Sequence, residues 1–94
     1  MAAEHLARRL KVLADPLRLR MLSLVLAHAE GEACVCDITA ALDLGDLAVS
    51  HHLNVMDEAG LLTSEVRGAW VYYRASPEGA ALYALLTRVH ATAS

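Results

Sequence analysis

Leucines recur at helical spacing from the start of the chain. Leu6, Leu10 and Leu13 lie three or four residues apart, which is the spacing of one face of a helix. Asp15 and Pro16 then form the usual beginning of a helix, a polar N-cap followed by proline at the first helical position. The apolar residues that follow predict a second helix that extends to about residue 29.

Further along the chain, two shorter helices precede a change of period. The first is predicted at about 37–42 and the second at about 47–59, with a tight turn between them. Residues 62–66 and 70–74 are rich in β-branched and aromatic side chains, and the glycine-containing turn between them predicts a hairpin. A Ser-Pro pair then starts a last amphipathic helix.

This order of elements predicts a mainly α-helical fold with a β-hairpin wing, a winged helix–turn–helix. We assign residues 1–94 to one domain, with the helix–turn–helix at about 36–59 and the wing at about 62–74. The helices at about 5–13 and 77–91 are expected to pair two copies into a homodimer. Hydrophobic residues make up 56% of this small chain, and a dimer interface would bury the excess. The alternative is that both helices only cover the core of a monomer.

Charge is distributed unevenly, and its sum does not favour a nucleic-acid partner. Eight Lys and Arg residues stand against eleven Asp and Glu, a formal net charge of −3. Most of the basic residues lie before residue 21, and between Arg20 and Arg67 every charged residue is acidic. No apolar run is long enough to span a membrane, and the first residues do not resemble a signal peptide. We therefore expect a cytoplasmic protein with no membrane partner.

Several motifs in this order carry a family resemblance. Residues 13–22 read LADPLRLRML, residues 33–38 read ACVCDI, residues 49–53 read VSHHL, residues 58–62 read EAGLL and residues 68–74 read GAWVYYR. Together they resemble the ArsR/SmtB family of metal- and metalloid-responsive repressors, in its arsenic-responsive branch. The resemblance implies a homodimer that binds double-stranded operator DNA and is released when an inducer binds.

The helix at about 47–59 and the hairpin are the parts expected to contact DNA. Two of their residues are placed to read base edges in the major groove, and an arginine in the hairpin is placed to meet a phosphate or the minor groove. The family commonly carries basic residues on this helix, whereas this chain has Asn54 and Asp57 there. The expected DNA-binding residues are Asp46, Leu47, Ser50, His51, Asn54 and Arg67. Because the helix is acidic, a dimeric scaffold with impaired DNA binding is the alternative interpretation.

Cys34 and Cys36 are the candidate inducer ligands. Their place before a helix N-terminus favours the thiolate form, and thiolates select soft ions such as arsenite, antimonite, cadmium or zinc. Cysteines this close rarely form a structural disulfide, so free thiols are expected. Arsenic-responsive relatives commonly carry a third cysteine where this chain has Thr39. Water or a small cellular thiol would then complete the site, unless a preceding segment supplies the third ligand. Redox sensing and an inert pair are the alternatives.

The remaining polar residues suggest no further chemistry. The chain has no nucleophile–base pair, phosphate-binding loop or paired carboxylates at a useful spacing, so we expect no enzyme activity and no required cofactor. Glu78 and His90 are too far apart to chelate zinc together, and His5 and His28 are expected to be surface residues. Trp70, Tyr72 and Tyr73 are expected to be packing residues of the hairpin and not a cofactor-binding group.

Overall fold

The computed structural model describes the backbone of residues 2–93 and the side chains of residues 2–88. Five α-helices, one 3₁₀ turn and three strands follow one another along this part of the chain. They are α1 (Ala3–Leu13), α2 (Pro16–Ala27), η1 (Ala29–Gly31), β1 (Glu32–Cys34), α3 (Val35–Leu42), α4 (Asp46–Glu58), β2 (Leu62–Arg67), β3 (Trp70–Ala75) and α5 (Pro77–Ala93).

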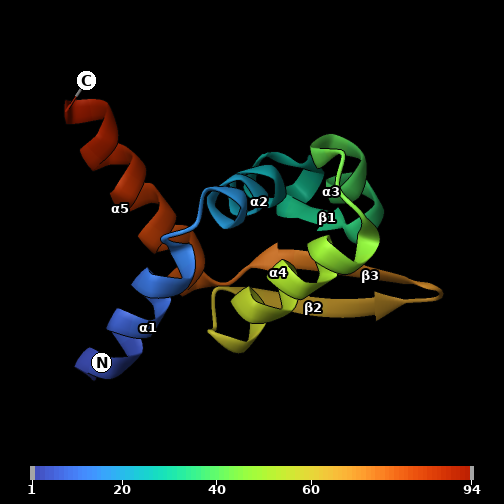
Figure 1. Ribbon diagram of the computed structural model, residues 1–94, viewed down its shortest axis with the longest axis horizontal. Helices are drawn as coiled ribbons and strands as arrows, with labels where there is room; N and C mark the ends of the chain where they lie inside the picture. The colour runs from blue at the N-terminus through green and yellow to red at the C-terminus, as the bar shows by residue number, and fades with distance from the viewer. Residues whose placement is uncertain (1, 94) are drawn as a thin grey trace.

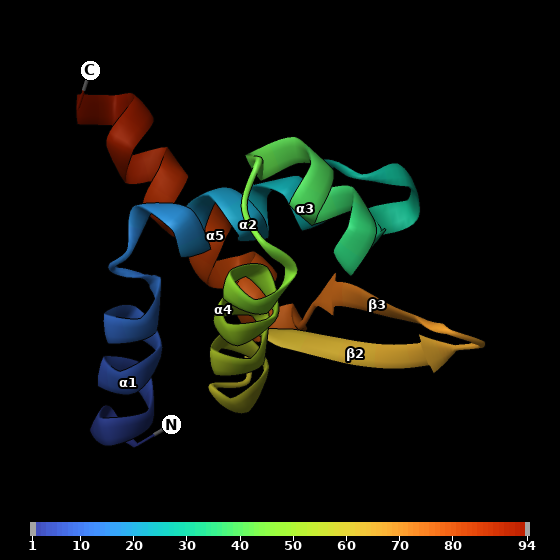
Figure 2. The same ribbon diagram turned by 45° about the vertical axis from the view of Figure 1, so that its right-hand side comes forward.

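The predicted fold class is confirmed: the molecule is mainly helical, with a helix–turn–helix followed by a β-hairpin wing. Helices α1 and α5 lie together at one end of the molecule, and the β2–β3 hairpin projects at the opposite end (Figures 1 and 2). Helices α3 and α4 lie between these two ends. The two candidate functions of the sequence, pairing and DNA contact, therefore belong to opposite ends of the chain's fold.

One strand, β1, was not predicted from the sequence. β1 pairs antiparallel with β3, so the hairpin belongs to a three-stranded sheet with the order β1-β3-β2. β1 has only three residues and runs directly into α3, which begins at Val35, whereas the sequence predicted a start near residue 37. Glu30 adopts a left-handed backbone conformation that ends the α2 region and turns the chain into β1. α2 itself ends at Ala27, two residues earlier than predicted.

The predicted beginnings of α2 and α5 are confirmed. The Asp15 carboxylate accepts hydrogen bonds from the backbone N–H groups of Leu17 and Arg18, at 2.9 and 3.3 Å. Ser76 caps α5 in the same way, because its Oγ accepts a hydrogen bond from the Gly79 N–H at 2.9 Å. These caps satisfy N–H groups that have no partner within the helix.

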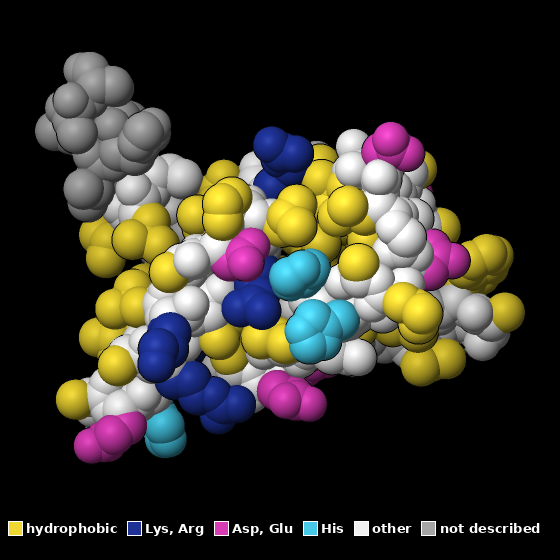
Figure 3. Space-filling view, viewed as in Figure 1, with side chains coloured by type: hydrophobic (Ala, Val, Ile, Leu, Met, Phe, Trp, Pro, Cys, Tyr) yellow, Lys and Arg dark blue, Asp and Glu magenta, His cyan; other side chains and the backbone are white. Residues whose placement is uncertain are grey.

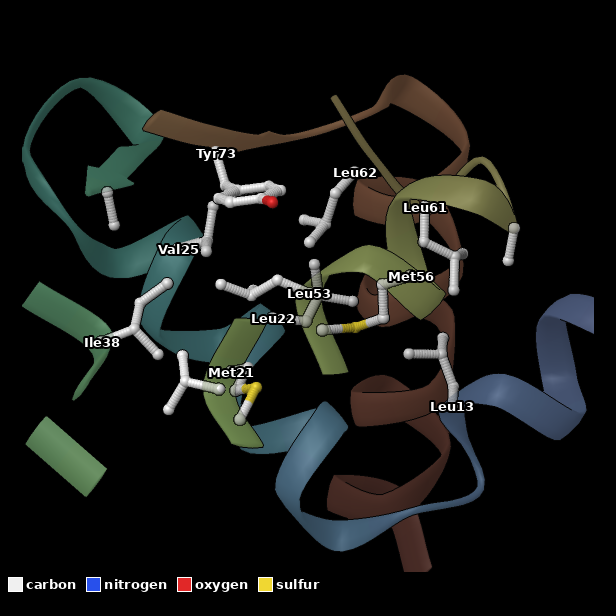
Figure 4. Close-up of a cluster of buried hydrophobic side chains, with 13 residues drawn as sticks. Leu13, Met21, Leu22, Val25, Ile38, Leu53, Met56, Leu61, Leu62 and Tyr73 are labelled. Atoms are coloured by element: carbon white, nitrogen blue, oxygen red, sulfur yellow. The ribbon is translucent and has the colours of Figure 1, made fainter. Parts of the chain in front are cut away.

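The hydrophobic core is built around α2, as Figure 4 shows. Met21, Leu22 and Val25 are completely buried. The buried cluster around them has members from α1, β1, α3, α4, β2 and β3, and partly buried side chains of α5 pack against it. Tyr73 on β3 closes the core on the sheet side. The core therefore fixes the recognition-helix candidate α4 against α2 and β3. The buried core residues are Leu13, Met21, Leu22, Val25, Ala33, Ile38, Val49, Leu53, Met56, Ala59, Leu61, Leu62 and Tyr73.

The start of α5 is held tightly to the corner between α4 and β2. Ser76 Oγ donates to the Gly60 carbonyl at 2.6 Å, and the Ser76 N–H donates to the Leu61 carbonyl at 3.0 Å. Gly79 is buried at this junction, and a Cβ atom there would lie against the backbone carbonyl of Leu61. The close approach of α5 therefore requires glycine at position 79.

We expect Gly79→Ala to destabilise the protein by about 1–3 kcal/mol, because the added methyl group meets backbone that cannot move aside. This is the opposite of the usual gain of about 1 kcal/mol when glycine becomes alanine inside a helix. Urea unfolding measures the difference. Gly45→Ser is the control, since Gly45 has φ −69° and no atom within 4 Å of a built Cβ. A Gly79→Ala variant as stable as the wild type would contradict the close approach.

Candidate nucleic-acid interface and thiol site

One face of α4 is open to solvent along its whole length. Leu47, His51, Asn54 and Glu58 follow one another at intervals of four, three and four residues, and all four are exposed. Leu47 is 89% exposed, which is unusual for a leucine next to a well-packed core. The opposite face of the helix is buried, so this stripe is what α4 presents to a partner.

Two polar residues of α4, one of them in this stripe, form hydrogen bonds to neighbouring elements. Asn54 Oδ1 accepts a hydrogen bond of 3.4 Å from the Tyr73 hydroxyl. The Asp57 carboxylate accepts one from Ser64 Oγ at 3.0 Å, so this acid faces β2. Burial and the nearby Asp57 charge raise the pKa of the Tyr73 hydroxyl, which keeps it a neutral donor. The acidic character of the exposed stripe is therefore limited to Glu58, with Asp46 at the start of the helix.

Basic residues from other helices flank α4. Arg18 Nε of α2 donates to His52 Nδ1 at 3.1 Å, and Arg9 Nε of α1 donates to the Ala59 carbonyl at 3.0 Å. A hollow next to the end of α4 is lined by Arg8 and Arg9 together with Glu58. In Figure 3, Lys and Arg side chains lie over α1 and next to the histidines of α4. The positive charge that the sequence lacks within α4 is thus placed beside it.

The wing arginine has internal partners, contrary to the simple expectation that it extends toward DNA. Arg67 forms two hydrogen bonds to the Glu32 carboxylate, at 2.7 and 2.8 Å, and further bonds to Glu65 at 2.6 and 2.9 Å. Its guanidinium also lies over the Tyr72 ring, 4.6 Å from the centroid. A phosphate that binds Arg67 must therefore compete with two carboxylates.

Glu32 is the main partner in this ion pair. Its side chain is only 14% exposed, and Arg74 approaches it at 3.2 Å from β3. The hydrogen bonds from Arg67, followed by the charges of Arg67 and Arg74, hold the Glu32 pKa below its usual value, and the pKa of Arg67 is raised in turn. Glu32 stands two residues before Cys34, so the ion pair joins the wing to the thiol site.

Cys34 and Cys36 lie at the beginning of α3. Cys34 is the N-cap and is 3% exposed, and its Sγ accepts a hydrogen bond from the Cys36 N–H at 3.3 Å. Cys36 is exposed on the first turn. The two sulfurs are joined in a disulfide, which corrects the expectation of free thiols. The extended N-cap residue brings the two Cα atoms to 5.2 Å, within the range that a disulfide spans.

Two further residues lie at the thiol site. Asp37 completes a capping box, because its carboxylate accepts a hydrogen bond from the Cys34 N–H at 3.0 Å. One carboxylate oxygen of Asp37 and both sulfurs lie within 4.8 Å of one another. His28 Nε2 is 3.3 Å from the Asp37 carboxylate, although the sequence analysis expected His28 to be only a surface residue. Asp37 could have been found from its position three residues after Cys34, whereas His28 is brought close by the turn into β1.

The comparisons with known proteins agree with this geometry. Residues 15–64 match the family model described as bacterial regulatory protein, arsR family. The chain belongs to the arsR family of bacterial regulatory proteins. The proteins of this family are transcription regulators and not enzymes.

Several relatives have names that refer to arsenic. The chain is 50% identical over 68 residues to an arsenic resistance transcriptional regulator of Pseudomonas putida, and this match covers 72% of the chain and 52% of the relative. It is 47% identical over 68 residues to the arsenical resistance operon repressor of Escherichia coli, and this match covers 71% of the chain and 56% of the relative. The match thus spans about half the length of these two relatives.

A solved structure shares the whole fold. It is the solution structure of a homodimeric winged helix–turn–helix DNA-binding domain from Mycobacterium bovis, described as a possible ArsR-family transcriptional regulator. The TM-score is 0.82 at 33% sequence identity, and the match covers 93% of this chain and 79% of the other. The arsR-family assignment therefore holds for the tertiary structure as well as for the motifs.

Three further expectations for this arsR-family chain concern Trp70, His90 and membrane-spanning segments. Trp70 is 56% exposed, so the expectation that it packs within the hairpin is wrong; the core on this strand is filled by Tyr73. The side chain of His90 lies outside the described residues. No helix in the described part of the chain combines the length and the apolar character that crossing a membrane requires.

The Glu32–Arg67 pair makes a pH-dependent prediction. Because the Glu32 pKa is lowered in the folded protein, the pair stabilises the fold above the usual glutamate pKa of about 4.3, and this contribution is lost as the pH falls through the lowered value. We expect Arg67→Ala to reduce the free energy of unfolding at about pH 6 and to have a smaller effect at about pH 3. Urea unfolding at the two pH values measures this.

An NMR titration provides the site-specific check. In Arg67→Ala the Glu32 carboxyl group should titrate at a higher pH than in the wild type, whereas Arg20→Ala, at an exposed position on α2, should leave it unchanged. An unchanged Glu32 titration in Arg67→Ala would contradict the assigned cause.

Proposed function

We propose that this chain represses transcription by binding operator DNA as a homodimer, and that a thiophilic inducer such as arsenite releases it. The exposed stripe of α4, beside the projecting wing, is the observation that carries the proposal. A helix presented in this way fits the major groove, and its polar members can reach base edges. Leu47 offers an apolar contact of the kind that a thymine methyl group accepts.

The residues proposed for DNA contact have different roles. His51 is exposed at the middle of the stripe and is our main candidate for a base contact, with Ser50 beside it. Asn54 contributes where Tyr73 leaves its amide group available. Asp46 and Leu47 are at the end of the helix that enters the groove. Arg67 contacts a phosphate when that contact replaces Glu32 and Glu65.

Arginines beside α4 support binding to the phosphate backbone of DNA despite the net charge of −3. Arg8 and Arg9 lie by the end of α4, and Arg18 lies along its side. Nonspecific affinity for DNA depends on how many phosphates the cations neutralise where they meet the backbone, rather than on the charge of the whole chain. These flanking arginines supply the phosphate contacts that α4 itself lacks.

The thiol box is the proposed inducer site. Two sulfurs at a helix N-terminus are stabilised as thiolates by the helix dipole and by the N–H groups of the first turn. Such ligands select arsenite, antimonite or another soft ion after the disulfide is reduced. Asp37 is a hard oxygen ligand in the same cluster, which suits zinc or cadmium better than arsenic.

The disulfide favours a second candidate, a repressor that responds to thiol oxidation at the same box. In that case DNA affinity differs between the oxidised and the reduced protein without any metalloid. Measuring DNA affinity for both the oxidised and the reduced protein therefore tests this candidate. A dimeric scaffold that no longer binds DNA is the remaining alternative, favoured by the exposed acids Asp46 and Glu58.

The dimer is proposed to form at the α1 and α5 end. Leu6, Leu10 and Leu85 are 44%, 40% and 54% exposed, and a hollow between the two helices is lined by Leu6, Leu82 and Leu85. Exposed leucines grouped on two adjacent helices are typical of an interface between copies. The wings would then lie away from the pairing surface.

We expect the reduced protein to bind duplex DNA with an affinity that falls steeply with salt, and arsenite to reverse the binding. Fluorescence anisotropy on a random duplex library at low and moderate salt measures both effects. His51→Ala should weaken binding about fivefold, the value of one hydrogen bond of about 1 kcal/mol, whereas Thr87→Ala on α5 should not. Cys34→Ser with Cys36→Ser should still bind but ignore arsenite.

The outcomes separate the candidates. No binding at low salt by a folded dimer would exclude the repressor and support the scaffold. Binding that changes with oxidation and is insensitive to arsenite would support the redox candidate.

The dimer makes its own prediction. Leu85→Asp places a charge in the proposed interface and should give a monomer in sedimentation at micromolar concentration, because an unpaired charge cannot be buried there without a large penalty. Leu47→Asp introduces the same charge at the exposed α4 position and should stay dimeric. A wild-type monomer at this concentration would rule out the interface.

A further inference from the structure

The two-thiol site leaves one bond of a trivalent arsenic atom without a protein sulfur. Cys34 and Cys36, the two cysteines of this sequence, supply two sulfurs. Asp37 is the nearest other ligand, but its carboxylate already accepts the Cys34 N–H at 3.0 Å and lies 3.3 Å from His28. A carboxylate oxygen is also a poor match for a soft ion. Asp37 therefore does not satisfy the third bond, which stays open to water or to an added thiol.

A groove begins at the exposed cysteine. It has a volume of about 300 Å³ and is bounded by Val35 and Cys36 of α3, Asp46 and Ser50 of α4, and residues 69–71 of the hairpin. This volume is at the lower end of the range for small-molecule sites. Trp70 lies in its wall and is 56% exposed, so an aromatic side chain is available to a molecule bound there.

The charge of the groove restricts what it can hold. Asp46 is the charged residue in its wall, and it forms no salt bridge within the described part of the chain. Ser50 adds a hydroxyl group next to it, and no basic side chain lines the groove. A molecule with an ammonium group fits this wall, whereas a carboxylate would be repelled by Asp46.

We propose that a small thiol with an ammonium group binds in this groove and supplies the third sulfur to arsenic held by Cys34 and Cys36. Arsenous acid reacts with the two cysteine thiols and the small thiol, so that three As–S bonds form and three water molecules leave. No oxidation or reduction occurs in this step. The disulfide is first reduced by two further molecules of the thiol, which leave as their own disulfide.

The location of the groove links this ligand to the proposed release from DNA. The body of the thiol lies between the first turn of α4 and the wing, next to Ser50. A ligand there occupies space beside the DNA-contacting stripe. This inference rests on the proposed inducer function, which it makes more specific.

X-ray absorption at the arsenic K edge counts the bound sulfurs directly. The protein is reduced with tris(2-carboxyethyl)phosphine, which has no thiol. It is then loaded with arsenite in three ways: without a thiol, together with cysteamine, and together with 3-mercaptopropionate. We expect two sulfurs and one oxygen without a thiol, and three sulfurs with cysteamine. Trp70 is the single tryptophan of the chain, so its fluorescence should change only when arsenite and cysteamine are both present.

Variants test the groove and the charge separately. The wild type should bind arsenite more tightly with cysteamine than with 3-mercaptopropionate, by up to about fivefold, which corresponds to a surface ion pair of up to about 1 kcal/mol. Asp46→Asn should abolish this preference, and Asp43→Asn, at the exposed end of α3, should retain it. Thr39→Cys should show three sulfurs in the phosphine alone, because positions 36 and 39 share a helix face.

Each outcome distinguishes the two proposals. Two sulfurs and one oxygen in every thiol would overturn the third-ligand proposal and leave the inducer site intact. Equal effects of the two thiols in the wild type would overturn the role of Asp46. No arsenite binding by either the wild type or Thr39→Cys would overturn the inducer function and this inference with it.

Discussion

The pairing of β1 with β3 is the constraint on which the functional parts depend. It places Glu32 opposite Arg74 and Cys34 opposite Tyr72, so the residues before α3 are aligned with the base of the wing. Without this short strand, the thiol box and the hairpin would be separate segments. With it, the capped start of α3, the first turn of α4 and residues 69–71 of the hairpin line one groove, and the Glu32–Arg67 ion pair lies two residues before Cys34. A change at the thiols is therefore made next to the elements proposed to contact DNA.

The second feature of the molecule is the way in which charge is redistributed by the fold. The sequence has no basic residue between Arg20 and Arg67, and the recognition-helix candidate is acidic. Folding brings arginines of α1 and α2 to α4, turns Asp57 toward Ser64, and pairs Arg67 with carboxylates. The electrostatic surface around the proposed recognition helix thus comes from several helices. Its strength depends on contacts far apart in the sequence, and the net charge alone is a poor guide to it.

Local signals were read correctly from the sequence, and long-range ones were not. The cap at Asp15 and the start of α5 after Ser76 depend on residues within three positions, so the pattern contained them. β1 was missed because three residues carry no period, and its pairing depends on a strand about forty residues away. The contacts of Arg67 with Glu32 and of His28 with Asp37 also follow from the turn into β1. The motifs located the candidate site, but its electrostatics came from tertiary structure.

The position of Cys36 suggests how an inducer at α3 can oppose DNA binding without a large conformational change. Cys34 is buried and fixed by the capping box, so its sulfur has little freedom. Cys36 is exposed and faces the groove between α4 and the wing. A ligand held between the two sulfurs is therefore anchored on the rigid side and projects on the open side. In the proposed repressor, its effect on DNA binding follows from occupied space and added charge beside Ser50, since no differential affinity between two global conformations is needed for a direct steric block.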